Sequence, residues 1–160
     1  MAAPTDRNIK IRFAFSVIGI LVGASIFFVF GLHYENWNTA LWGLLSALGA
    51  AVTLFVHVQY TRDVWRTFPY RLRYFMLTGC FIQLAGVCGF VAYLTLAITQ
   101  HQHLKAYGNG FYLATIWCFM TWKWGFLLFY FSRAYRQLYL DIYTILPQEA
   151  KDDYKPYSNF

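Results

Sequence analysis

The stretch WNTALWGLLSALGAAVTLFVHVQY, residues 37–60, decides the fold of this chain, because its twenty-four residues carry no formal charge. A helix of about 20 apolar residues crosses the hydrocarbon core of a bilayer. Lipid offers no water to the backbone amides, so a segment of this kind is expected to be one continuous helix. The stretch therefore predicts a transmembrane helix that has one histidine, His57, near its end.

Three other stretches have the same character, so four spans are predicted, at about residues 13–32, 38–60, 74–99 and 110–132. Charged residues make up 12% of the 160-residue chain, against about 25% in soluble proteins. The loops are too short for a second domain. We predict an all-α membrane protein whose residues 1–160 form a single four-helix transmembrane domain with a tail at 133–160.

The basic residues outside the predicted spans indicate how the chain is oriented. Those on one side are Arg7, Lys10, Arg12, Arg62, Arg66, Arg71, Arg73, Arg133 and Arg136, whereas the connections on the other side hold only Lys105. Lys and Arg accumulate on the cytoplasmic side of a membrane. Both termini are therefore predicted to be cytosolic. The net charge of +6 suits contact with anionic membrane lipids, and nothing in the chain suggests nucleic acid.

His57 is the first candidate for chemistry. By helical spacing it shares a face with Thr53 and Tyr60, which is predicted to turn toward the bundle interior. Ionisable groups within spans are costly and by default mark a ligand or ion pathway. Imidazole nitrogen and tyrosine oxygen both bind iron. The alternative is a structural histidine that is hydrogen-bonded between helices.

Lys123, near the centre of the fourth span, is the most costly side chain, because a lysine at mid-bilayer costs about 2.5–3.5 kcal/mol on insertion scales. It is either a counter-charge for an anionic substrate or a cation that packs on aromatic rings and fixes the bundle. The aromatic residues around it suit either core packing or a large flat apolar ligand. No motif of a known enzyme class occurs, so the protein is predicted not to be an enzyme.

Two further features concern the loops and the helix contacts. His101 and His103 in the third connection could capture a metal, although two exposed histidines are a weak signal by themselves. Small residues spaced four apart predict close helix contacts, within one chain or in a homo-oligomer. They are Gly19 and Gly23, Gly43 and Ala47, and Ala85 and Gly89.

Four segments in order resemble the haem-responsive-gene (HRG) family of haem transporters. They are HVQYTRDVWRT (57–67), LAITQHQ (96–102), TWKWGFLL (121–128) and FSRAYR (131–136). The resemblance extends from the first span to about Asp141. It implies four spans with cytosolic termini and the movement of haem, as transported substrate, from the exterior or an endolysosomal lumen into the cytosol.

The resemblance also implies roles for particular residues. Histidines of the family match His57 and His101, which would ligate haem iron transiently and in sequence. An aromatic-basic motif of the family matches Phe131, Arg133 and Tyr135, while Ala134 replaces a lysine of some members. Tyr60, His103 and Lys123 complete the predicted haem-binding set. The alternative function is a four-span protein that binds haem or lipid for trafficking without transport.

The predicted location is the endosome or lysosome membrane, with access to the plasma membrane, mainly because of the family resemblance. The tail contains YRQL (135–138), YLDI (139–142) and YTIL (143–146), each of which fits a tyrosine-based sorting signal for trafficking adaptors. Chance matches are expected in a tail so rich in tyrosine.

Overall fold

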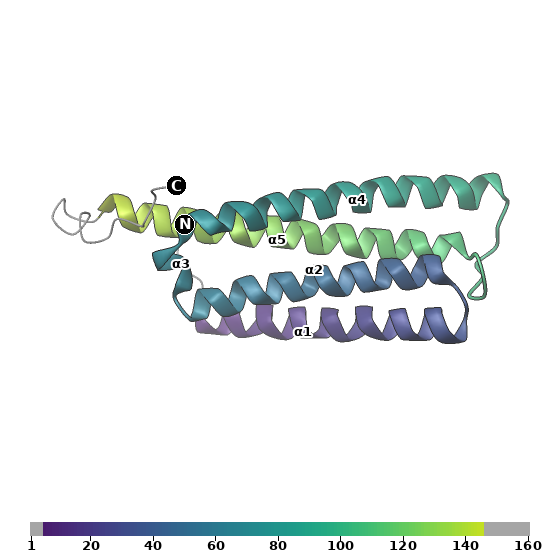
Figure 1. The fold of residues 1–160 in the computed structure, drawn as a ribbon, viewed down its shortest axis with the longest axis horizontal. Coiled ribbons are helices and arrows are strands. Elements are labelled where there is room, and N and C mark those ends of the chain that lie inside the picture. Colours follow the sequence, from purple (N-terminus) through teal and green to yellow (C-terminus); the bar gives the residue numbers. More distant parts are fainter. Residues whose placement is uncertain (1–4, 146–160) are drawn as a thin grey trace.

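The computed structural model describes residues 5–145, with side chains described through Asp141. Within that range the chain is helical and contains no strand, which confirms the all-α prediction (Figure 1). Its elements are α1 (Asp6–Phe28), a π-helical turn (Val29–His33), α2 (Trp37–Thr61), α3 (Val64–Thr67), a 3-10 turn (Pro69–Arg71), α4 (Leu72–Thr99) and α5 (Phe111–Ile145).

Three segments are long and apolar enough to cross a membrane: Asp6–His33, Trp37–Thr61 and Pro69–Thr99. They correspond to the first three predicted spans. The helix α5 is not among these three segments. It is less apolar than they are because it contains Lys123 and the neighbouring tryptophans. A fourth span and cytosolic termini therefore stay predictions.

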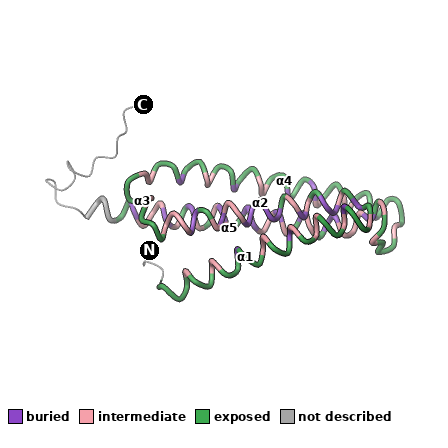
Figure 2. Tube along the Cα trace, turned by 60° about the horizontal axis from the view of Figure 1, so that its bottom comes forward, coloured by how far each residue is buried: buried purple, intermediate pink, exposed green. Residues whose placement is uncertain are grey.

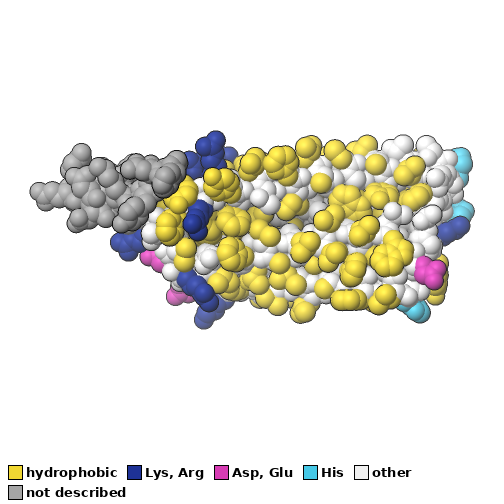
Figure 3. All heavy atoms as spheres, viewed as in Figure 1, with side chains coloured by type: hydrophobic (Ala, Val, Ile, Leu, Met, Phe, Trp, Pro, Cys, Tyr) yellow, Lys and Arg dark blue, Asp and Glu magenta, His cyan; other side chains and the backbone are white. Residues whose placement is uncertain are grey.

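The surface of the bundle divides into a broad hydrophobic band and two polar ends (Figure 3). Most Lys and Arg side chains gather at the end that holds the start of α1, the connection between α2 and α4, and α5 beyond residue 132. We call this the basic end. The opposite end holds the exposed His33, His101 and His103, and we call it the histidine end.

The helices pack as two antiparallel pairs, α1 with α2 and α4 with α5, joined by contact between α2 and α5 (Figures 1 and 2). Half of the apolar window of α2 is buried, against 11% in the segment that contains α1. The helix α2 is thus central, whereas α1 is peripheral. Figure 2 shows α1 diverging from the other helices toward its N-terminus.

Glycines allow the helix pairs to approach closely. A Cβ atom added at Gly23 would lie 2.8 Å from the backbone N of Ala47 and the O of Gly43, and one at Gly89 would collide with the Trp42 ring. The close contacts predicted at Gly19, Gly23, Gly43, Ala47 and Gly89 are therefore present within the chain, whereas Ala85 is exposed. Gly79 in α4 meets the backbone of α5 in the same way.

Two hydrogen-bond sets fix the ends of the bundle. At the histidine end, the buried Asn36 caps α2 by accepting from the Thr39 amide, and its Nδ2 donates to the carbonyls of Ala106 and Gly110. At the basic end, the indole of Trp65 in α3 donates to the carbonyl of Val56 over 3.0 Å. The core cluster around Val56 and Trp65 includes Tyr135, which α5 supplies because it continues past residue 132.

Candidate functional site

His57 is buried in the interior of the bundle, near the basic end. Its side chain is 1% exposed, and Ala50 and Thr53 on the same face of α2 are buried as well. This confirms that the face turns inward. The Thr53 hydroxyl donates to the carbonyl of Gly49 within α2. The hydrogen-bond partner of the imidazole therefore comes from another helix.

The nearest polar partner of His57 is Tyr135 of α5. The imidazole Nδ1 lies 2.8 Å from the Tyr135 hydroxyl, and this hydroxyl also accepts a hydrogen bond of 3.2 Å from Nη1 of Arg12. Tyr60, one turn after His57 on α2, stacks on the Tyr135 ring with centroids 4.2 Å apart. The hydroxyl of Tyr135 thus links α1, α2 and α5 through one atom.

Phe131, one turn before Tyr135, forms the aromatic wall of the same site. Its ring meets the His57 ring edge-on at 4.7 Å, and the guanidinium of Arg12 lies 4.5 Å from the Phe131 centroid. An arginine over an aromatic face is an attractive cation–π arrangement. We call Arg12, His57, Tyr60, Phe131 and Tyr135 the His57 site.

The hydrogen-bond pattern leaves one nitrogen of His57 without a partner. An Arg N–H can only donate, so the Tyr135 oxygen accepts from Arg12, and the hydroxyl proton is free to point at His57 Nδ1. The second ring nitrogen, Nε2, is buried and has no hydrogen-bond partner. Buried polar atoms are normally paired, so an unpaired one is a reason to look for a ligand. Neutral imidazole is the commonest metal ligand of proteins.

Lys123 lies on the same junction of helices, farther from the basic end. Its Nζ is 5.0 Å from the ring centroids of both Phe15 and Trp124. A cavity of about 180 Å³ adjoins it where α1, α2 and α5 meet, lined among others by Gly19 and Ser46. The cation–π packing that the sequence suggested for Lys123 is therefore present. Lys123 also lines this cavity.

The remaining predicted residues lie elsewhere. Arg133 is exposed and takes no part in the contacts of the His57 site, although Phe131 and Tyr135 on either side do. His101 and His103 are exposed at the histidine end, where His101 has a φ of 46°. Among the described residues, no group of three or more His, Cys, Asp or Glu side chains could hold a metal ion. Those two histidines are not part of a preformed metal site.

Distance separates the two ends. His57 stands twenty positions after Trp37 in α2, and Trp37 lies beside the loop that contains His101. At about 1.5 Å per residue this is roughly 30 Å. Haem iron cannot be held by His57 and His101 at the same time, which agrees with the expectation that they act in sequence.

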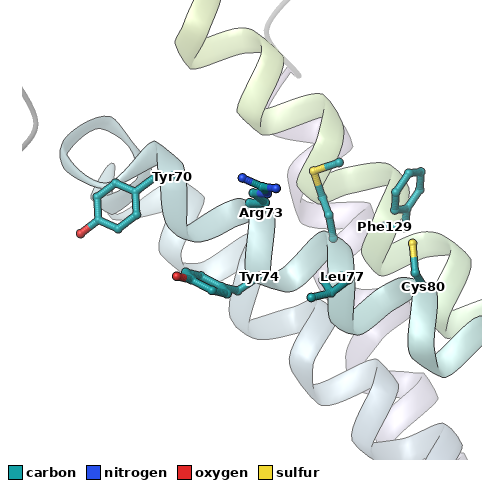
Figure 4. A pocket seen from close by; sticks show the side chains of 7 residues that line it. Tyr70, Arg73, Tyr74, Leu77, Cys80 and Phe129 are labelled. Atoms are coloured by element: carbon teal, nitrogen blue, oxygen red, sulfur yellow. The ribbon is translucent and has the colours of Figure 1, made fainter. Parts of the chain in front are cut away.

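A larger groove of about 570 Å³ lies on the outer surface, where α4 and α5 meet near the basic end (Figure 4). It is lined by Tyr70, Arg73, Tyr74, Met76, Leu77, Cys80 and Phe129. Tyrosine and arginine at this depth suit a membrane interface. The groove contains no residue of the His57 site.

The tyrosines of two predicted sorting signals are buried in α5. Tyr135 and Tyr139, which begin YRQL and YLDI, are 2% and 8% exposed within α5. The Tyr139 hydroxyl donates to Asp63 over 3.0 Å. In this conformation neither tyrosine is accessible to an adaptor. The third motif, YTIL, lies outside the residues whose side chains are described.

Comparison with known proteins identifies the chain's relatives. Residues 72–124 match the model of a family described as "Haem-transporter, endosomal/lysosomal, haem-responsive gene". The chain is 27% identical to Heme transporter hrg-1 of Caenorhabditis elegans, an alignment that covers 81% of this chain and 69% of the relative. It is 24% identical to Heme transporter hrg-6 of the same organism, covering 91% and 92%. The chain thus resembles the HRG family of haem transporters.

The family match extends from α4 into α5 and includes His101, His103 and Lys123. The His57 site lies outside those residues, although the longer alignments with the HRG relatives cover most of the chain. No solved structure matches the chain. The geometry of the site therefore comes from the chain's own structure.

Arg12 is the residue of the site that the sequence analysis missed. In the sequence it counts only among the basic residues that indicate the orientation. A signal existed, because Arg12 stands directly at the start of the first apolar run, where a guanidinium can reach into the interface. Nothing in the sequence, however, shows that it reaches Tyr135, which is 123 residues away.

Proposed function

We propose that this chain moves haem across a membrane into the cytosol through the helix junction that contains Lys123 and the His57 site. The observation that carries this proposal is the buried His57, whose Nε2 has no partner and whose surroundings are aromatic. The names of the curated relatives, which are haem transporters, support it.

The chemistry of the site suits the chemistry of haem. Haem is a flat apolar ring with one iron that accepts ligands and two propionates. Phe131 and Tyr60 offer aromatic faces to the ring, His57 and Tyr60 offer ligands to the iron, and cationic groups can neutralise the propionates. Lys123 is proposed as the cation for a propionate deeper in the bundle, and Arg133 as one at the exposed surface.

Because His57 is covered, haem reaches it only after a rearrangement. On one side the cover is formed by Arg12 and by Phe13, whose ring centroid lies 6.3 Å from that of the imidazole, and both belong to α1. The helix α1 is the least buried of the three candidate spans. We propose that the N-terminal half of α1 moves away from α5 to admit haem, while the close contact at Gly23 holds its other half.

The proposed direction is from the histidine end to the basic end. His101, assisted by His103, captures haem at the exposed loop, and His57, with Tyr60 as an additional ligand, receives the iron near the other side. The concentration of Lys and Arg at the basic end supports a cytosolic orientation of that end. The family description supports an endosomal or lysosomal membrane, and the protein is proposed to act without enzymatic chemistry.

The test is haem uptake by a haem-requiring cell that expresses this chain, compared with the empty vector and with His57→Ala at equal membrane level. We expect the chain to restore growth on low haem and His57→Ala to lower uptake. His33→Ala, which removes an exposed histidine from the other end, is the matched control. Haem binding by the purified protein without any gain in uptake would favour the alternative, a haem- or lipid-binding trafficking protein that does not transport.

A further inference from the structure

Arg12 is a cation whose two partners in the structure are uncharged. Its Nη1 donates to the Tyr135 hydroxyl over 3.2 Å, and its guanidinium lies 4.5 Å above the Phe131 ring. The side chain is half-buried, so one side of it faces the site and the other is open. As α1 moves to admit the ligand, a guanidinium in this position can exchange its neutral partner for an anionic one.

The exchange is favourable because hydrogen bonds between two charged groups are stronger than those to a neutral hydroxyl. A guanidinium presents parallel N–H groups that match both oxygens of a carboxylate. The partner that Arg12 would give up, Tyr135, remains in contact with His57 and Tyr60. Losing Arg12 therefore leaves the Tyr135 hydroxyl with a hydrogen-bond partner.

We propose that Arg12 is the residue that recognises a carboxylate of the ligand: it leaves Tyr135 and pairs with a haem propionate. This inference rests on the proposed function, since it takes haem as the ligand. It makes Arg12 a specificity-determining residue that favours the free porphyrin acid over forms in which the carboxylates are blocked.

The exchange also prepares His57 to bind iron. While Arg12 donates to Tyr135, the tyrosine proton points at Nδ1, and the single proton of the neutral imidazole resides on Nε2. Once Arg12 has left, the Tyr135 oxygen can accept from an N–H at Nδ1. The imidazole keeps one proton, which moves from Nε2 to Nδ1 by exchange with water, and the Nε2 lone pair becomes available. Carboxylate capture and iron ligation are thereby coupled through Tyr135.

The experiment compares the binding of ferric haem and of its dimethyl ester, which has the same ring and iron but no free carboxylate. Binding to the purified full chain in lipid nanodiscs is followed by the Soret absorbance. The proteins are the wild type, Arg12→Met, Arg12→Lys and, as matched control, Arg7→Met. Arg7 is an exposed cation on the same helix.

We expect the wild type and Arg7→Met to bind haem about tenfold or more tightly than the ester, as one charged hydrogen-bond pair allows. Arg12→Met should lose most of the preference for haem over the ester, mainly through weaker haem binding, and Arg12→Lys should retain more of it. Equal binding of haem and ester by the wild type would overturn the inference while leaving haem binding intact, and this comparison needs no variant.

A second outcome would also overturn the inference. If Arg12→Met weakened haem and the ester by the same factor, Arg12 would be a structural residue. If the wild type bound neither ligand, the proposed function itself would fail and the inference with it. Circular dichroism and size-exclusion profiles of each variant establish that the binding data come from folded protein.

Discussion

The two ends of the bundle hold histidines in opposite circumstances. At the basic end, one buried histidine contacts side chains from α1 and α5 and has an unpaired nitrogen. At the histidine end, His101 and His103 stand in one exposed loop, and no group of metal-ligating side chains surrounds them in the described part of the chain. In the sequence, the pair of histidines resembles a metal site more than the single one does.

The difference shows that surroundings, more than the number of ligands, make a site. Burying a polar ring nitrogen without a partner destabilises the fold by about 1–3 kcal/mol. An exposed imidazole has no such cost, since water satisfies it. A buried unpaired nitrogen therefore indicates a function, whereas two exposed histidines are compatible with a simple solvent-facing loop.

The largest effect is expected from removing both ligands of the His57 site. His57→Ala/Tyr60→Ala should reduce haem transport by about tenfold or more, a loss of the size that disrupted metal sites show. His57→Ala alone should retain part of the activity, because Tyr60 can ligate iron. The measurement is haem transport into proteoliposomes at matched protein content. Wild-type rates in the double variant would reduce His57 to a packing residue and remove the contrast between the ends.

Tyr135→Phe tests the same end through a single oxygen atom. The change leaves both Arg12 and His57 Nδ1 without their common partner, so we expect the free energy of unfolding to fall by about 1–3 kcal/mol. Thermal unfolding in detergent measures this. Tyr74→Phe, in which the tyrosine is 68% exposed, is the control and should change little. Equal stability of the two variants would mean that the hydroxyl bridge contributes nothing to the fold.

Asn36→Ala tests what holds the histidine end together. It removes the cap of α2 and two hydrogen bonds to the loop at 100–110. Loss of such a cap costs about 0.5–2 kcal/mol, and haem binding at the His57 site should be unaffected. Asn8→Ala, an exposed asparagine in α1, is the matched control for stability. A loss of Soret binding in Asn36→Ala would show that the two ends are coupled.

The smallest effect is expected from His101→Ala. An exposed capture residue raises the local concentration of haem, so its loss should lower uptake a few-fold at low external haem and leave the maximal rate unchanged. Uptake measured over a range of haem concentrations separates the two cases. A fall in the maximal rate as large as that of His57→Ala would place His101 in the rate-limiting step and contradict the difference between the two ends.

The sequence alone determined the helical fold, because a long uncharged stretch in lipid has no alternative to a continuous helix. It also determined that the His57 face turns inward, since Thr53 and His57 are spaced for one side of a helix, and that small residues such as Gly23 bring helices together. Helical spacing likewise places Phe131 and Tyr135 on one face of α5. All of these follow from local periodicity.

Only the tertiary structure decided which faces meet. It brought Tyr135 to His57 over 78 positions and Arg12 to Tyr135 over 123 positions, and it left Arg133 outside although it lies between two residues of the site. Local periodicity fixes the direction of a side chain around its own helix, whereas the partner it meets depends on how the helices are ordered and shifted along their axes. That order is set by the packing at Gly23, Gly79 and Gly89, which no single segment of the sequence contains.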